Sequence, residues 1–321
     1  MRIIGKGTVT SLVLSFLLFL SGVSSFAAER LKFASAIKMT PAYYLPILAA
    51  EEKGFWKENG LDVDWVPFRG GPDMHTALLA GEITIGLDPA TGNLPGIARG
   101  VPMILVSDHQ NTEGLALYVS SGSRLREPKD IKGARIGVTR LGASDHAQAR
   151  FVAKLLGIEK DVRYVGTGGI SEKIAALKSG AVDAITFFIF PIIELKIKGE
   201  VRQLLSLEEY FPKEWLGHVM FAHKDFARKS PDTVKRVIRS VLNALDYVRK
   251  DADWAMRTMK KEQNYSDEAA RQIYPILRFT KDGRINPQAL ENVRNFLLDY
   301  DVVPKGKLPP VAEIYISQFL P

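Results

Sequence analysis

The chain has 321 residues, a length that corresponds to about two ordinary domains. Hydrophobic residues make up 46% and charged residues 25%, which is a globular composition and excludes a long low-complexity or disordered tail. The formal net charge is +7, but the basic residues are spread along the chain and do not form the concentrated stripe that nucleic-acid binding requires. The sequence has no cysteine, which excludes disulfides, thiol nucleophiles and Cys-based zinc sites.

The first 27 residues differ from the rest. Arg2 and Lys6 precede an apolar run from Val9 to Val23, and Ser25 and Ala27 then provide small residues at a cleavage site. This pattern predicts a secretory signal peptide that is cleaved after Ala27, because the run is short for a membrane anchor. No cysteine follows the run to carry a lipid, so we expect a released protein in a bacterial periplasm. Without Arg2 and Lys6 the formal charge falls from +7 to +5.

Short apolar runs alternate with helical patterns along the mature chain. In the first half, strands are expected at 31–34, 61–66, 83–87, 101–106 and 115–119, and helices at 41–52, 73–80 and from Pro89 onward. After a polar linker at 120–133, strands are expected at 135–138, 162–165, 182–186, 201–205 and 217–222, and helices at 144–156, 171–178 and 191–197. This alternation predicts parallel pairing and an α/β layered fold.

The remainder is mainly helical. Apolar residues at i, i+3 and i+4 spacing run from Pro231 to Val248, and two further helical patterns cover 266–277 and 287–298. We expect these helices to cover the first unit, which makes that unit discontinuous. The predicted organisation is a lobe of residues 28–118 plus 222–321 and a second lobe of residues 119–221, with hinge segments near 115–120 and 217–222.

One stretch occurs twice in related form. Residues 70–86 read GGPDMHTALLAGEITIG, and residues 168–184 read GGISEKIAALKSGAVDA. Each has a Gly-Gly turn, a short helix, a single Gly and an apolar strand. Two such units in two lobes would present helix N-termini to one cleft, where backbone N–H groups and the helix dipole favour a negative group. The alternative is that the glycines only make turns.

Four motifs in a fixed order resemble a known family. They are AEEKGFWKENGLDV at 50–63, ALLAGEI at 77–83, IKGARIGV at 131–138 and ALKSGAVDA at 176–184. In this order and spacing they resemble the substrate-binding proteins of ABC importers of the nitrate/sulfonate/taurine and thiamine-precursor type. The resemblance implies a two-lobed type II periplasmic-binding fold, in which each lobe is a mostly parallel sheet flanked by helices. It also implies closure on a ligand and delivery to an ABC permease in the inner membrane.

Candidate ligand-binding residues lie where predicted strands give way to helices. Tyr43 and Tyr44 are aromatic contacts, although one of them is expected in the core, and Arg69 is either an anion partner or a solvated surface residue. Asp88 is either a ligand contact or a helix cap. The first-lobe candidates are Lys38, Tyr43, Tyr44, Arg69, Gly70, Gly71, Asp88, Thr91, His109 and Asn111.

In the second lobe, the loop 139–146 joins a strand to a helix, and the resemblance implies that this loop contacts ligand. Ser144 is also a good helix N-cap by position. Asp145 and His146 interrupt a loop that is Gly/Ser/Thr-rich in sulfonate binders, which weakens the expectation of a simple sulfonate pocket. The second-lobe candidates are Thr139, Arg140, Ser144, His146, Gly168, Gly169 and Phe188.

The sequence does not favour an enzyme. It has no Gly-x-Ser-x-Gly, His-Glu-x-x-His or phosphate-loop motif, and its five histidines lack zinc spacing. No cofactor and no metal are expected. Two alternatives stay open: a thiamine-pyrimidine-synthase-like enzyme on the same fold, whose branch is cytosolic, and a ligand-sensing partner of a signalling receptor. The expected partners are a small organic ligand, preferably an anion, and the permease; the chain is expected to be a monomer.

Overall fold

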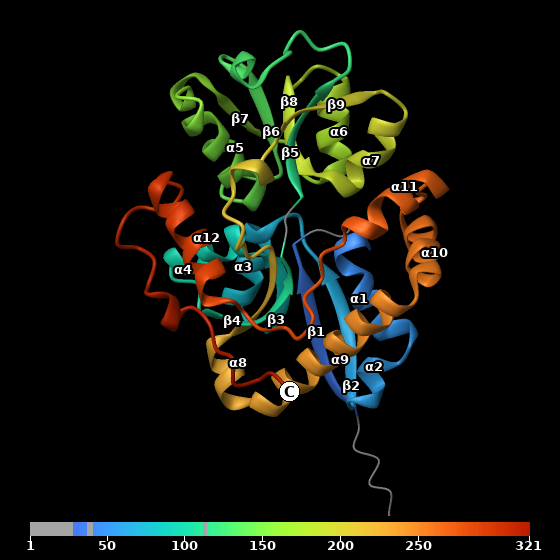
Figure 1. Ribbon diagram of the computed structural model, residues 1–321. Helices are drawn as coiled ribbons and strands as arrows, with labels where there is room; N and C mark the ends of the chain where they lie inside the picture. The colour runs from blue at the N-terminus through green and yellow to red at the C-terminus, as the bar shows by residue number, and fades with distance from the viewer. Residues whose placement is uncertain (1–27, 37–40, 112–113) are drawn as a thin grey trace, which may run out of the picture.

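The computed structural model describes residues 28–36, 41–111 and 114–321, so the predicted signal peptide and Lys38 lie outside the described residues. The chain forms two lobes, each with a five-stranded sheet (Figure 1). The first sheet has the order β2-β1-β3-β10-β4, with β1 Glu29–Ser35, β2 Leu61–Pro67, β3 Ile85–Pro89, β4 Met103–Gln110 and β10 His218–His223. The second has the order β7-β6-β8-β5-β9, with β5 Leu115–Ser120, β6 Arg135–Val138, β7 Arg163–Gly166, β8 Ala184–Phe188 and β9 Val201–Ser206.

Each sheet contains one strand that runs against the other four. Strand β10 is antiparallel to β3 and β4, and β5 is antiparallel to β8 and β9, so the expectation of parallel pairing holds only for β1, β2 and β3 and for β6, β7 and β8. The reason lies in how the chain crosses. Strands β4 and β9 both end on the side of their sheet that faces the other lobe. The next strand, β5 or β10, enters the other sheet from that side and therefore runs away from it.

The crossings themselves are short. The chain leaves the first sheet after Gln110 and enters the second at Leu115, and it returns between Ser206 and His218. The expected lobe boundaries after residues 118 and 221 fall inside β5 and β10. The expected hinge at 115–120 coincides with β5, and the one at 217–222 consists of Gly217 and most of β10. Because both strands are held by sheet hydrogen bonds, we propose that the hinge includes the return segment 207–217.

Helices cover both sheets. Those of the first lobe are α1 Pro41–Glu52, α2 Phe55–Glu58, α3 Gly71–Leu79 and α4 Ala90–Ala98, and those of the second are α5 Ser144–Leu155, α6 Ile170–Lys178 and α7 Ile189–Ile197. The C-terminal series is α8 Lys224–Lys229, α9 Pro231–Lys250, α10 Ala252–Gln263, α11 Asp267–Ile273 and α12 Pro287–Asp299. Helix α9 packs on α1 as expected, whereas α11 reaches α7 of the other lobe (Figure 1). Among the described residues, none of these helices is both long and apolar enough to cross a membrane.

The two Gly-Gly stretches form the same unit in the same place of both sheets. One is the turn from β2 into α3 and the other is the turn from β7 into α6. Gly70 has φ 114° and its N–H donates to the Ala36 oxygen at 2.7 Å, while Gly168 has φ 97° and donates to the Thr139 oxygen at 3.2 Å. Both conformations favour glycine. In each lobe the hydrogen bond ties the turn to the segment that follows the adjacent strand.

Gly86 in β3 allows close packing against β1 and β10. A Cβ atom there would lie 2.7 Å from the Ala34 oxygen and 2.8 Å from Phe221 Cζ. Replacing Gly86 with alanine is expected to lower the free energy of unfolding by about 1–3 kcal/mol, because the backbone oxygen cannot move aside. Gly166→Ala in β7 is the matched control, since nothing lies within 4 Å of its Cβ position. Equal urea midpoints for the two variants would contradict the prediction.

Candidate functional site

A narrow, partly open cavity lies between the two lobes. Its walls come from strand ends and helix starts of both lobes, the positions at which α/β sheets bind ligands. The first lobe contributes Ala36, Tyr43, Tyr44, Gly70, Gly71, Asp88, Pro89 and His218. The second contributes Thr139, Ala143, Ser144, Asp145, Phe187 and Phe188.

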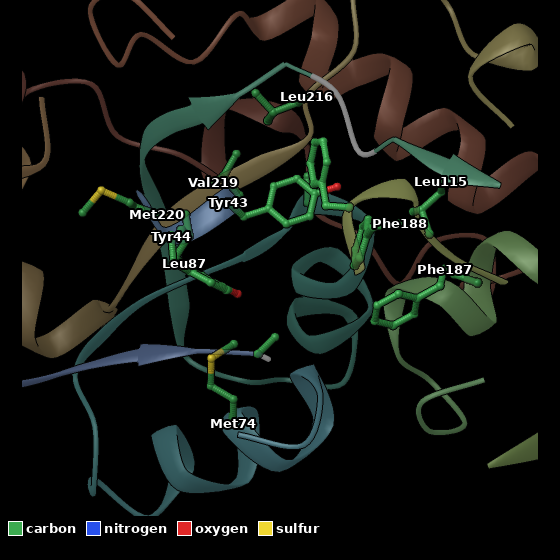
Figure 2. Close-up of a cluster of buried hydrophobic side chains, with 14 of the residues drawn as sticks. Tyr43, Tyr44, Met74, Leu87, Leu115, Phe187, Phe188, Leu216, Val219 and Met220 are labelled. Carbon is green, nitrogen blue, oxygen red and sulfur yellow. The ribbon is translucent and has the colours of Figure 1, made fainter. Parts of the chain in front are cut away.

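Aromatic rings form one wall. The Tyr43 ring stacks on His218 with ring centroids 4.1 Å apart, and it makes edge-to-face contacts with Phe188 and Phe190, with ring centroids 4.9 Å and 4.7 Å apart. Figure 2 shows Tyr43 of α1 beside Phe188 from the other lobe, with Phe187 further along the same strand end. The peptide oxygen of Tyr43 is bonded to His109 Nε2 at 2.8 Å, which fixes the start of α1. Such a wall suits a flat or apolar ligand body.

Burial keeps two histidines neutral here, His218 in this wall and His109 behind it. Burial lowers the pKa of His109 to about 4 and that of His218 well below its usual value. The wall therefore carries no positive charge from these rings at neutral pH. The Nδ1 atom of His218 has no hydrogen-bond partner within the described part of the chain, and a buried polar atom of this kind is stabilised by a partner that a ligand can supply.

Asp88 lies at the end of β3 and is buried. A Cβ atom at Gly71 would lie 2.6 Å from its Oδ2 atom, and one at Gly92 would lie 2.7 Å away. These two glycines therefore make room for the carboxylate. Asp88 is not the cap that its position suggested, because α4 begins after Pro89 and no side chain caps it. Beneath it, His75 Nε2 lies 3.9 Å from Oδ2, and burial lowers the pKa of His75 to about 4.

The loop between β6 and α5 folds onto its own carboxylate. The N–H and the hydroxyl of Thr139 both donate to Asp145 Oδ2, at 2.6 Å and 3.0 Å, and Lys173 of α6 pairs with the same oxygen. Ala143, not Ser144, precedes the first helical residue, and the Ser144 hydroxyl does not cap the helix. His146 is turned away from the cavity, where its Nδ1 accepts the Gly142 N–H at 2.9 Å.

Direct contacts join the lobes at the cavity. The Thr91 and Ser144 hydroxyls lie 2.5 Å apart, one at the start of α4 and the other at the start of α5. Arg140 pairs with Asp73 of α3 at 3.0 Å, across the outer end of the same cleft. The structure is therefore that of lobes closed against one another.

A family model described as NMT1/THI5 like matches residues 42–255, which is more than half of the chain. The chain belongs to the NMT1/THI5-like family. A Brucella abortus protein named as a binding protein is 26% identical over 249 residues, covering 74% of this chain and 76% of the relative. The Saccharomyces cerevisiae 4-amino-5-hydroxymethyl-2-methylpyrimidine phosphate synthase THI11 is 24% identical over 248 residues, covering 70% and 68%.

The solved structures support the fold of this NMT1/THI5-like protein. The alkanesulfonate-binding protein SsuA from Xanthomonas axonopodis pv. citri, bound to MOPS, superposes with a TM-score of 0.76 at 19% identity. The superposition covers 91% of this chain and 98% of that one. The superposition establishes the two-lobed periplasmic-binding fold that the motifs implied. At 19% identity, the ligand of that structure does not transfer to this chain.

The NMT1/THI5-like chain brings together about half of the residues selected from its sequence. The candidates that line the cavity are Tyr43, Tyr44, Gly70, Gly71, Asp88, Thr139, Ser144 and Phe188. The others do not line it: Thr91 and His109 are buried behind its walls, Arg69 and Asn111 are exposed, and Arg140, His146, Gly168 and Gly169 lie on the outer side of the second lobe's loops. Both tyrosines are buried and both face the cavity, so neither is purely core.

Three polar or aromatic wall residues were not selected: Asp145, Phe187 and His218. Asp145 and Phe187 are sequence neighbours of selected residues. His218 carries no local signal, because it reaches the cavity only through the return crossing. Among the described residues there is no cluster of His, Asp or Glu that would hold a metal ion.

Proposed function

We propose that this protein is an exported solute-binding receptor that captures a small organic ligand by closure of its lobes and delivers it to an ABC importer. The observation that carries the proposal is the cavity itself, which both lobes line and which closes through the contact of Thr91 with Ser144. The names of the Brucella relative and of the sulfonate-binding structures support it. The proposal includes export to the periplasm by the predicted signal peptide and action there as a monomer.

The wall chemistry favours a ligand with a ring or another apolar body over a bare ion such as nitrate. Tyr43, Phe187 and Phe188 present carbon surfaces, which gain little from a small hydrated ion. The unpartnered His218 Nδ1 offers a hydrogen bond in the same wall. The resulting ligand class is a small organic molecule that places its apolar body against the wall formed by Tyr43, Phe187 and Phe188.

Binding can be tested by thermal unfolding of residues 28–321 with sulfonates, nitrate, carboxylates and pyrimidines. One organic class is expected to stabilise the protein saturably, by about 2.7 kcal/mol at a hundredfold excess over its dissociation constant. Phe188→Leu is expected to weaken that ligand by about tenfold, since aromatic contacts contribute roughly 0.5–1.5 kcal/mol beyond burial. Phe226→Leu, on the remote helix α8, is the matched control. Equal affinity in both variants would place binding elsewhere.

The named activity of the yeast relatives supports a second candidate, synthesis of a pyrimidine phosphate on the same fold. The two functions separate in one experiment. A receptor returns its ligand unchanged after incubation and unfolding, whereas a synthase yields a new pyrimidine phosphate in the supernatant. Mass spectrometry of the supernatant distinguishes them, and a new product would overturn the receptor proposal.

A further inference from the structure

A buried ion pair lies in the cavity wall of the second lobe. Lys173 of α6 is fully buried, and its Nζ atom donates to three acceptors: Asp145 Oδ2, Thr139 Oγ1 at 3.1 Å and the Thr186 oxygen at 3.2 Å. Nζ also lies 4.3 Å from the centre of the Phe187 ring. Three acceptors match the three N–H groups of an ammonium, so Lys173 is held as a cation although burial lowers its pKa.

Asp145 is surrounded by donors. Its Oδ2 atom accepts from Lys173, from the Thr139 N–H at 2.6 Å and from the Thr139 hydroxyl at 3.0 Å, while Oδ1 accepts from the His146 N–H at 3.1 Å. Asp145 also lies in the first turn of α5, where the helix dipole favours a negative charge. An ammonium, a hydroxyl, two backbone N–H groups and a helix start are together the donor set that binds a carboxylate or sulfonate.

The first lobe has no such pair at the corresponding place. Lys173 lies five residues after Gly168, and the residue five after Gly70 is His75. Burial lowers the pKa of His75 to about 4, so this side chain is neutral. The duplicated unit therefore carries a cation beneath the turn only in the second lobe, and that cation is already neutralised by a carboxylate of the same lobe.

We propose that Asp145 is a built-in anion, which fills the anion-binding position of the second lobe and thereby sets the ligand specificity of the receptor. The ligand then contacts this lobe through a neutral hydrogen-bonding group. An acidic group would be repelled by the Asp145 carboxylate, and the donors that could bind it are already bonded to Asp145. This inference rests on the proposed receptor function and narrows its ligand class: sulfonates and carboxylates are excluded from the side of the cavity lined by Thr139, Asp145 and Phe187.

Removing the built-in anion should create a site for an external one. In Asp145→Ala the Lys173 ammonium and the Thr139 N–H are left facing the space that the carboxylate vacates. We expect a lower melting temperature that formate, acetate or methanesulfonate restores saturably, with an affinity at least about tenfold higher than for the wild type. Sodium chloride at equal ionic strength controls for screening. Asp145→Ala/Lys173→Met, which lacks the cation, is the matched variant and should show no saturable response.

Asp145→Ser keeps a small polar side chain and covers the case in which the alanine variant does not fold. Its hydroxyl cannot neutralise Lys173 and leaves space for the smallest of the anions, so formate is expected to stabilise it more than chloride does. The inference is overturned if no anion exceeds the chloride control in either single variant, or if the double variant responds equally. This readout does not depend on the natural ligand.

The receptor function is tested separately in the wild type. A sulfonate that stabilises the wild type and loses affinity in Phe188→Leu would overturn the inference while leaving the receptor proposal intact. If no organic compound stabilises the wild type but anion rescue occurs in Asp145→Ala, the built-in anion stands and the receptor proposal fails.

Discussion

Replacing Phe151 with alanine is expected to lower the free energy of unfolding by about 3–5 kcal/mol. Phe151 lies on α5 of the second lobe and is 2% exposed. Its ring centroid lies 4.6 Å from that of Phe296 and 4.5 Å from that of Tyr300, and both of these rings belong to the α12 region of the first lobe. It lies 5.9 Å from the ring centroid of Phe211 in the return crossing. The variant would leave a cavity among rings that come from three separate parts of the chain.

Urea unfolding measures this loss, and Leu155→Ala provides the control. Leu155 is on the same helix but is 40% exposed, so its truncation is expected to change stability by less than about 1 kcal/mol. Phe151→Ala should also weaken ligand binding, because the closed arrangement of the lobes loses a contact that it needs. A Phe151→Ala variant as stable as Leu155→Ala would show that the aromatic cluster does not join the lobes.

Local pattern was enough to place most of the secondary structure. Helix α1 begins at Pro41 and ends at Glu52 as expected, and β6 spans Arg135–Val138 as expected, because each is bounded by residues that strongly start or stop an element. Helix α10 was missed. In Ala252–Gln263 only Trp254, Ala255, Thr258 and Met259 are buried, and so narrow an apolar stripe is hard to distinguish from a solvated segment by periodicity.

Strand direction could not be read in the same way. Strands β5 and β10 are short, mostly buried apolar strands. Their residues do not indicate that the chain has just crossed between the lobes. Direction follows from the edge at which a strand enters its sheet, which is a property of the path of the whole chain.

The same limit applies to the site. Gly70, Gly71, Asp88 and Thr139 were found because they follow strands, where helix starts meet the cleft. Lys173 is 28 residues from Asp145 and reads in the sequence as one more polar position of a short helix. Only the fold brings the two charges together beneath the cavity wall, and the specificity that we infer from them has no local signature.

The protein is expected to lose stability steeply as the pH falls from about 6.5 towards 4.5. Burial lowers the pKa of His75 and His109 to about 4 and that of His218 well below 6.5. Their folded pKa values lie below the unfolded value, so the stability that they contribute is present above pH 6.5 and is lost as the pH falls towards the folded values. The unfolded chain takes up three protons in this window that the folded chain does not.

One group acts in the opposite direction. Burial raises the pKa of Asp108 to about 7, so its folded carboxyl keeps a proton that the unfolded one releases until the pH approaches 4. Burial also lowers the pKa of His146, so at least three protons are bound on unfolding and one is released. The net uptake is about two or more, and stability should fall by at least about 2.7 kcal/mol per pH unit near pH 5. Urea unfolding at pH 7, 6, 5 and 4.5 measures this slope, and His75→Gln should reduce it by about 1.4 kcal/mol per unit. A flat profile would mean that these histidines are already protonated in the folded chain. Since His218 stacks on Tyr43 in the cavity wall, ligand contact should further disfavour a charge on His218. The ligand then binds best to the neutral ring, so the same titration with bound ligand should show the ligand stabilising the protein less once the pH is low enough for His218 to take up a proton.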